Sequence, residues 1–168
     1  MKHENGFTLI ELIIVIVVLG ILAVTALPRF LEFSEDANAS VTKASGAAFI
    51  SAVKLTNVKW KLDGQGAAID NYDVFGSGTN LIDVNAAGWP VKQDPSVEAS
   101  PVLDGSDDCV SLWNGILNSG SVTAALDTSG DFQATYATNN CTYTMVNSPD
   151  YSVFYNSNTG QVIIDSTL

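Results

Sequence analysis

The 168-residue sequence predicts an α+β fold, in which one long N-terminal helix is followed by an antiparallel β-sheet. Three observations predict this fold. Residues Leu12 to Pro28 are uncharged and almost all apolar, helical spacing of apolar residues continues to Leu62, and short alternating segments separated by turn residues fill the last part of the chain. A chain of this length is sufficient for one domain with its own core.

The apolar run, extended back to Phe7, has the length of a bilayer-spanning helix, on the order of 20 residues. It has no polar face, so it is not an ordinary surface helix, and it is too long for a strand. Three alternatives are a buried core helix, a secretory signal cleaved at Val24-Thr25-Ala26 and a plain signal anchor. Glu11 fits the last two poorly, because an ionisable group inside such a segment usually has a function. We therefore predict a transmembrane or filament-core helix at residues 7–28.

The helical pattern continues as an amphipathic half at residues 29–62, and Gly64 and Gly66 end it. We predict one buried stripe, formed by apolar residues at steps of three and four: Ala37, Val41, Ala44, Ala48, Ala52, Leu55, Val58 and Leu62. Pro28 removes a backbone donor, so we expect a bend in the helix there.

Residues 63–168 are predicted to form a globular β domain. Residues 63–85 and 93–105 are expected to be loops, with a short edge strand at 88–91 between them. Ser106 is expected to cap a short helix at 106–118, and a strand is expected at 121–126. Two hairpins should follow, the first with a turn at Asn139-Asn140: residues 132–137 with 141–146, and 151–155 with 161–165.

Charge and chemistry exclude several function classes. Six of the seven Lys and Arg residues lie at or before Lys61, whereas thirteen of the eighteen acids follow it, so the distal part should repel nucleic acid. The sequence has no nucleophile motif, no phosphate-binding glycine loop and no zinc-type ligand spacing, so we expect no enzyme activity, no catalytic residue, no metal and no cofactor. Asp104, Asp107 and Asp108 match no calcium loop and are interpreted as helix-capping acids.

Cys109 and Cys141 are the only cysteines. A chain with an export-like N-terminus favours one disulfide between them, although two buried free thiols are the alternative. Because disulfides form in oxidising compartments, this prediction also places the distal part outside the cytoplasm and the N-terminus inside.

The segment Gly6-Phe7-Thr8-Leu9-Ile10-Glu11, followed at once by the apolar run, resembles the class III signal of type IV pilins and of the pseudopilins of type II secretion. The resemblance implies a leader at residues 1–6, cleavage by a prepilin peptidase between Gly6 and Phe7, and N-methylation of Phe7. Pro28 lies where many type IV pilins have a helix-bending proline. The stretch Ala26-Leu27-Pro28-Arg29-Phe30-Leu31 is most similar to pilins of the mannose-sensitive haemagglutinin (MSHA) type.

The resemblance implies a pilin, major or minor, that assembles into a type IV pilus and serves adhesion. Its expected partners are other pilin subunits, the prepilin peptidase, the inner-membrane assembly machinery and membrane lipid. The chain should cross the inner membrane once, with its C-terminal domain in the periplasm, and become extracellular in the pilus. Glu11 of one subunit is expected to pair with the Phe7 amine of the next, because burying one charge costs less beside an opposite charge. A pseudopilin and a monomeric membrane-anchored binding domain are the alternatives.

Overall fold

A computed structural model describes residues 7–118 and 122–167 of the chain. The chain divides into two compact units, Met1–Ala37 and Asn38–Leu168, and each is considered by itself below. Helix α1 (Leu9–Leu62) supplies the regular structure of the described residues of the N-terminal unit and the first element of the C-terminal unit. The predicted long helix is therefore present, although it begins at Leu9 rather than at residue 7, and Pro28 lies within it.

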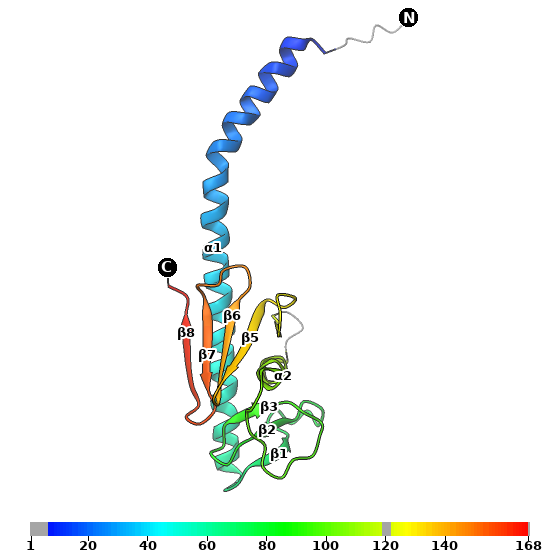
Figure 1. Cartoon of the computed structure of the whole chain (residues 1–168), viewed down its shortest axis with the longest axis vertical. Coiled ribbons are helices and arrows are strands. Elements are labelled where there is room, and N and C mark those ends of the chain that lie inside the picture. Colours follow the sequence, from blue (N-terminus) through cyan, green and yellow to red (C-terminus); the bar gives the residue numbers. More distant parts are fainter. Residues whose placement is uncertain (1–6, 119–121, 168) are drawn as a thin grey trace, which may run out of the picture. The chain divides into compact units, whose positions relative to one another are not determined.

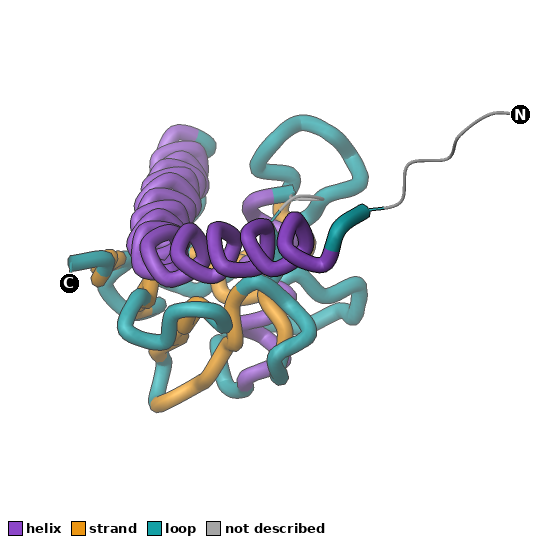
Figure 2. The backbone as a smooth tube through the Cα atoms, turned by 90° about the horizontal axis from the view of Figure 1, so that it is seen from above, coloured by secondary structure: helices purple, strands orange, loops and turns teal. Residues whose placement is uncertain are grey.

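A five-stranded sheet lies on the part of α1 that belongs to the C-terminal unit (Figures 1 and 2). Its strand order is β4-β5-β6-β7-β8, and all neighbours are antiparallel except β4 and β5. The strands are β4 (Ala124–Ala125), β5 (Phe132–Ala137), β6 (Asn140–Met145), β7 (Ser152–Asn156) and β8 (Gln161–Asp165). Both predicted hairpins are confirmed, and the α+β plan is confirmed with them. The first turn lies at Thr138 and Asn139, which both have positive φ, rather than at Asn139-Asn140.

A second, three-stranded sheet has the order β1-β2-β3, and helix α2 (Ser106–Leu117) packs between it and the larger sheet (Figure 1). Its strands are β1 (Ile69–Tyr72), β2 (Ile82–Val84) and β3 (Pro90–Lys92). The prediction of an unbroken loop at 63–85 is wrong, because that region contains β1 and β2. These strands are three or four residues long, so their few buried side chains give too short a period-two pattern to be recognised. Pro90 opens an edge strand, as its missing N–H predicts.

The start of α2 differs from the prediction. Gly105 rather than Ser106 is the N-cap residue, and no side chain caps this end. The Ser106 hydroxyl instead accepts a hydrogen bond from the Tyr136 backbone N–H at 3.2 Å. The helix ends at Asn118, whose left-handed conformation is a common way to terminate a helix.

The face that α1 buries is not the predicted one. The sheets cover an inner face, defined by Thr42, Ser45, Phe49, Val53, Thr56, Asn57 and Trp60. Most of the predicted stripe is exposed and forms an outer face: Val41, Ala44, Ala48, Leu55, Val58 and Leu62. Both faces have helical spacing, so periodicity alone does not choose between them. The inner face carries the aromatic side chains, which bury more area, and Asn57 there donates to Gly88 O at 2.8 Å.

Aromatic rings form the centre of the core between α1, α2 and the five-stranded sheet. Phe49 of α1 stacks on Trp113 of α2 with ring centroids 5.2 Å apart. Its edge contacts Tyr143 and Tyr155 at centroid distances of 5.6 and 5.5 Å. Both of these phenols have an acceptor, since Tyr143 donates to Cys109 O at 2.9 Å and Tyr155 to Pro90 O at 2.7 Å. The core therefore fixes α1, α2 and the sheet against one another.

Candidate processing and assembly segment

The first turn of α1 is closed by a reciprocal pair of side chains, Thr8 and Glu11. Thr8 donates to Glu11 Oε2 from its backbone N–H at 2.8 Å and from its hydroxyl at 2.8 Å. The Glu11 backbone N–H donates to Thr8 Oγ1 at 3.3 Å. With α1 beginning at Leu9, Thr8 is the residue before the helix and Glu11 the third residue within it. This is the geometry of a capping box, which satisfies amide groups that a helix start leaves unpaired.

Sequence reasoning assigned Glu11 to assembly and missed its role in capping. The signal was available, because a Thr followed three residues later by a Glu, directly before an apolar run, is the pattern of a capping box. Both hydrogen bonds from Thr8 end on one carboxylate oxygen, Oε2. The Glu11 side chain therefore stabilises the start of its own helix, whatever it does between subunits.

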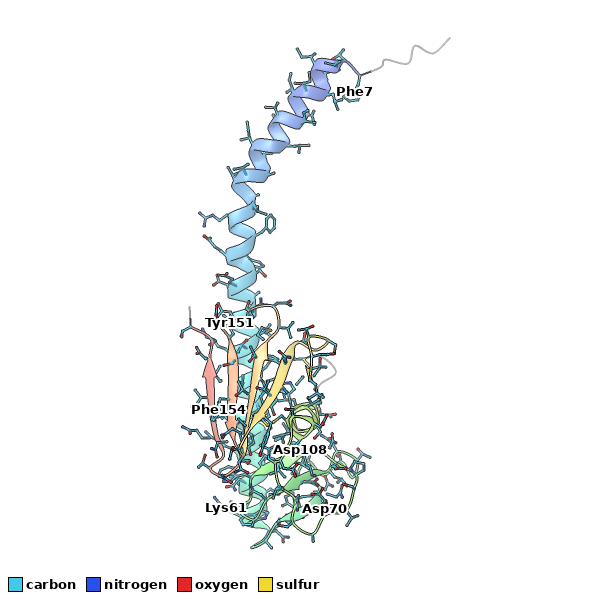
Figure 3. The ribbon with its side chains drawn as sticks, viewed as in Figure 1. Phe7, Lys61, Asp70, Asp108, Tyr151 and Phe154 are labelled. Carbon is cyan, nitrogen blue, oxygen red and sulfur yellow. A yellow bond between two sulfur atoms is a disulfide. The ribbon has the colours of Figure 1, made fainter. Side chains whose placement is uncertain are left out.

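Phe7 lies in front of α1 and is 88% exposed (Figure 3). Gly6 and the rest of the leader lie outside the described residues. The structure thus places Phe7 and Glu11 near one helix end, where Glu11 forms the capping box with Thr8. Cleavage at Gly6-Phe7, methylation of Phe7, the role of Glu11 in assembly and a bend at Pro28 stay predictions.

The apolar run of α1 is uncovered within the N-terminal unit. Its large side chains from Leu9 to Leu27 are between 45% and 76% exposed. In length and composition, α1 qualifies as a membrane-crossing helix. Such a surface is unfavourable in water, because removing apolar area from water is favourable by about 25 cal/mol per square ångström. Membrane anchoring of this helix fits both its composition and its exposure.

The C-terminal unit also exposes apolar side chains, on the outer face of its part of α1. Leu55, Val58 and Leu62 are each about half or more exposed, although the inner face of the same helix is fully packed. Lys43, Lys54 and Lys61 also lie on exposed positions of this helix. An apolar row of this length on a folded unit is typical of a surface that meets a partner.

Cys109 and Cys141 form a disulfide, as the sequence predicted. It connects the first turn of α2 to β6, and both residues are fully buried. The two cysteines are 32 residues apart, and for a loop of this size the chain-entropy account gives a stabilisation of about 3 to 4 kcal/mol.

A local hydrogen bond links two acidic residues at the start of α2. Asp108 accepts a hydrogen bond from the Asp104 backbone N–H at 2.9 Å. Among residues 7–118 and 122–167, no three His, Cys, Asp or Glu side chains are grouped in a way that would hold a metal ion. Burial raises the pKa of Asp108 above its usual range.

Comparison with known families gives one match. The family described as the prokaryotic N-terminal methylation motif matches residues 1–27, which cover the leader, Phe7, Glu11 and most of the apolar run. The chain therefore carries a prepilin-like N-terminal signal of the kind found in type IV pilins, and its α+β arrangement fits a pilin fold. No curated protein and no solved structure matches the chain.

Proposed function

We propose that this chain is a structural subunit, a pilin, of a type IV pilus. A prepilin peptidase removes residues 1–6, and the mature helix anchors the subunit in the inner membrane until it is assembled. The observation that carries the proposal is the methylation motif at residues 1–27, whose apolar part forms a helix that nothing covers within its own unit. Neighbouring subunits would cover this helix in the filament.

The outer face of α1 supports assembly over a monomeric anchored domain. A monomer would need only the membrane-spanning part of the helix to be apolar. Here Leu55 and Leu62 remain exposed far beyond a bilayer-spanning length of about 20 residues. A helix from a second copy, packing along this row, would remove both apolar surfaces from water at once.

The same proposal covers the cellular location of the C-terminal unit and its role in adhesion. The disulfide Cys109–Cys141 favours an oxidising environment, so the C-terminal unit would lie in the periplasm before assembly and outside the cell afterwards. Adhesion through the exposed surface of that unit, and a closer relation to MSHA-type pilins, follow from the resemblance of residues 26–31. The chain itself would perform no catalysis.

In the proposed mechanism, cleavage creates a charged amine on Phe7, and this amine pairs with Glu11 of the neighbouring subunit. The uncut precursor lacks that amine, so processing acts as a switch. The capping box leaves this pairing feasible, because both Thr8 hydrogen bonds use only Oε2 of Glu11. Register between subunits would then come from a charge pair in an apolar environment, where breaking such a pair costs about 3 to 5 kcal/mol.

The capping box provides matched variants that separate the two roles of Glu11. Glu11→Gln keeps one side-chain oxygen as an acceptor and replaces the other with an amide nitrogen, so it still caps the helix but carries no charge. Thr8→Ala removes the hydroxyl partner and leaves the charge. We expect Glu11→Gln to be cleaved normally, to accumulate in the membrane and to form few or no filaments. Thr8→Ala should be cleaved and should assemble.

The experiment measures chain mass for cleavage and counts filaments by electron microscopy for each variant expressed alone. Filaments in normal numbers from Glu11→Gln would exclude the charge pair as the source of register. Failure of Thr8→Ala together with success of Glu11→Gln would assign Glu11 to capping alone.

A further inference from the structure

Two acidic side chains accept hydrogen bonds from the same residue, Asn71, at an irregular point of the three-stranded sheet. Asp83 is in the central strand β2 and is 0% exposed. The Asn71 backbone N–H donates to Asp83 Oδ1 at 2.8 Å, and the Asn71 side-chain amide donates to Asp70 Oδ2 at 2.7 Å. Asn71 has a positive φ of 53° at a register shift between β1 and β2. One residue in an uncommon conformation therefore holds both carboxyl groups.

The second oxygen of each carboxyl group has no donor. Asp70 Oδ1 and Asp83 Oδ2 are buried, and neither has a hydrogen-bond partner among the described residues. Burying an ionised carboxylate oxygen without a partner is costly, and two such groups together add repulsion. As a pair of carboxylates, Asp70 and Asp83 would be unfavourable.

The charges around the pair do not neutralise it. Lys92 is opposite Asp83 in the β2–β3 register, but its Nζ lies 2.6 Å from Glu98 and 3.7 Å from Asp94. The charge of Asp108 in α2 also acts on Lys92. The groups that face the pair are thus one lysine, already engaged by two acids, and further carboxylates.

We propose that Asp83 takes up a proton in the folded state, and that this makes the three-stranded sheet sensitive to pH. The proton comes from solvent and resides on Asp83 Oδ2, the buried oxygen that has no donor. Protonation would remove the buried charge of Asp83 and its repulsion by neighbouring Asp70. Loss of the proton restores both costs and loosens β1 against β2.

The pKa of Asp83 sets the pH range over which the site changes its protonation. Burial raises the pKa of Asp83 from its usual 3.8 to about 6, and the charge of Asp70 adds to the rise. A raised carboxyl pKa means that the folded state binds the proton more tightly than the unfolded state does. The site therefore contributes most stability at low pH, and the contribution is lost as pH rises through about 6.

The test compares the full chain in detergent micelles with Asp83→Asn, at pH 7.5 and pH 5. Denaturant unfolding followed by tryptophan fluorescence gives the unfolding equilibrium constant. When the pH is lowered from 7.5 to 5, the folding equilibrium constant of the wild type should rise about tenfold relative to that of Asp83→Asn. This is the factor expected for a carboxyl group whose pKa is about 6 in the folded state. Asp150→Asn, at an exposed position, is the control and should follow the wild type.

Two results would overturn the proposal. One is the same pH dependence in the wild type and Asp83→Asn. The other is a rise in wild-type stability at pH 7.5 on adding calcium chloride that Asp83→Asn lacks, which would assign the site to a cation. If Asp83→Asn does not fold, carboxyl carbon NMR of the wild type decides, because the proposal requires one aspartate to titrate near pH 6 and fails if all titrate below 5.

Discussion

At the scale of single residues, two glycines share a backbone conformation but differ in the room around them. Gly160, in the β7–β8 turn, has φ of 69°, and a Cβ there would lie 2.3 Å from the Trp89 ring. Gly76 has φ of 67° and no atom within 4 Å of the same position. The pair therefore separates the cost of the left-handed conformation from the cost of a steric clash.

We predict that Gly76→Ala destabilises the chain by about 1 to 2 kcal/mol, the usual cost of this conformation for a residue with a Cβ. Gly160→Ala should destabilise the chain by this same amount and by about 1 to 3 kcal/mol more, since Trp89 or the turn must move. Denaturant unfolding of both variants in detergent measures the difference. Equal destabilisation would show that Trp89 does not limit the space at Gly160.

The site residues illustrate what sequence can and cannot predict at this scale. Phe7 and Glu11 were found because they occupy fixed positions before an apolar run. That Asn71 donates to both Asp70 and Asp83 was not predictable, since it depends on a register shift between two strands too short to recognise. A capping box is a local pattern, so the link between Thr8 and Glu11 could have been read from the sequence.

At the scale of elements, α1 has two apolar faces with different tasks. Val53 is fully buried on the inner face, and Leu55, two residues later, is 49% exposed on the outer face. The inner face holds the fold of the C-terminal unit. In our account, the outer face meets neighbouring subunits.

An aspartate on the inner face should therefore lower stability, whereas an aspartate on the outer face should impair assembly. Val53→Asp places a charge in the core and should destabilise the unit by more than about 4 kcal/mol. Leu55→Asp should change stability by less than about 1 kcal/mol, leave a normal membrane pool and abolish most filaments. Unfolding in detergent and filament counts by electron microscopy give the two readouts. Normal filaments from Leu55→Asp would remove the outer face from the assembly surface.

Strands and helices were predictable from the sequence to different degrees. The hairpins β5–β6 and β7–β8 were recognised because alternation and turn residues act locally. The buried face of α1 was not, because a row of Ala, Val and Leu looks like a core stripe. The identity of the buried face depends on where Phe49 and Trp60 find aromatic and backbone partners, and those lie far along the chain.

At the scale of the whole molecule, the two units have contrasting surfaces. The N-terminal unit exposes large apolar side chains throughout its helix, whereas the C-terminal unit has a closed aromatic core and a disulfide. Most acids of the chain lie in residues 63–168, and α1 carries four lysines after residue 42. This division suits a subunit whose N-terminal helix is buried by lipid or by other subunits, and whose C-terminal unit faces water.

The central claim is that the chain is processed at Gly6-Phe7 and built into filaments. The most direct test is the mass of the chain recovered from filaments sheared off cells. Our account predicts a chain that starts at Phe7, carries one added methyl group and retains the disulfide. Absence of the chain from the filaments, with a cellular form that starts at Met1 or Leu27, would contradict it.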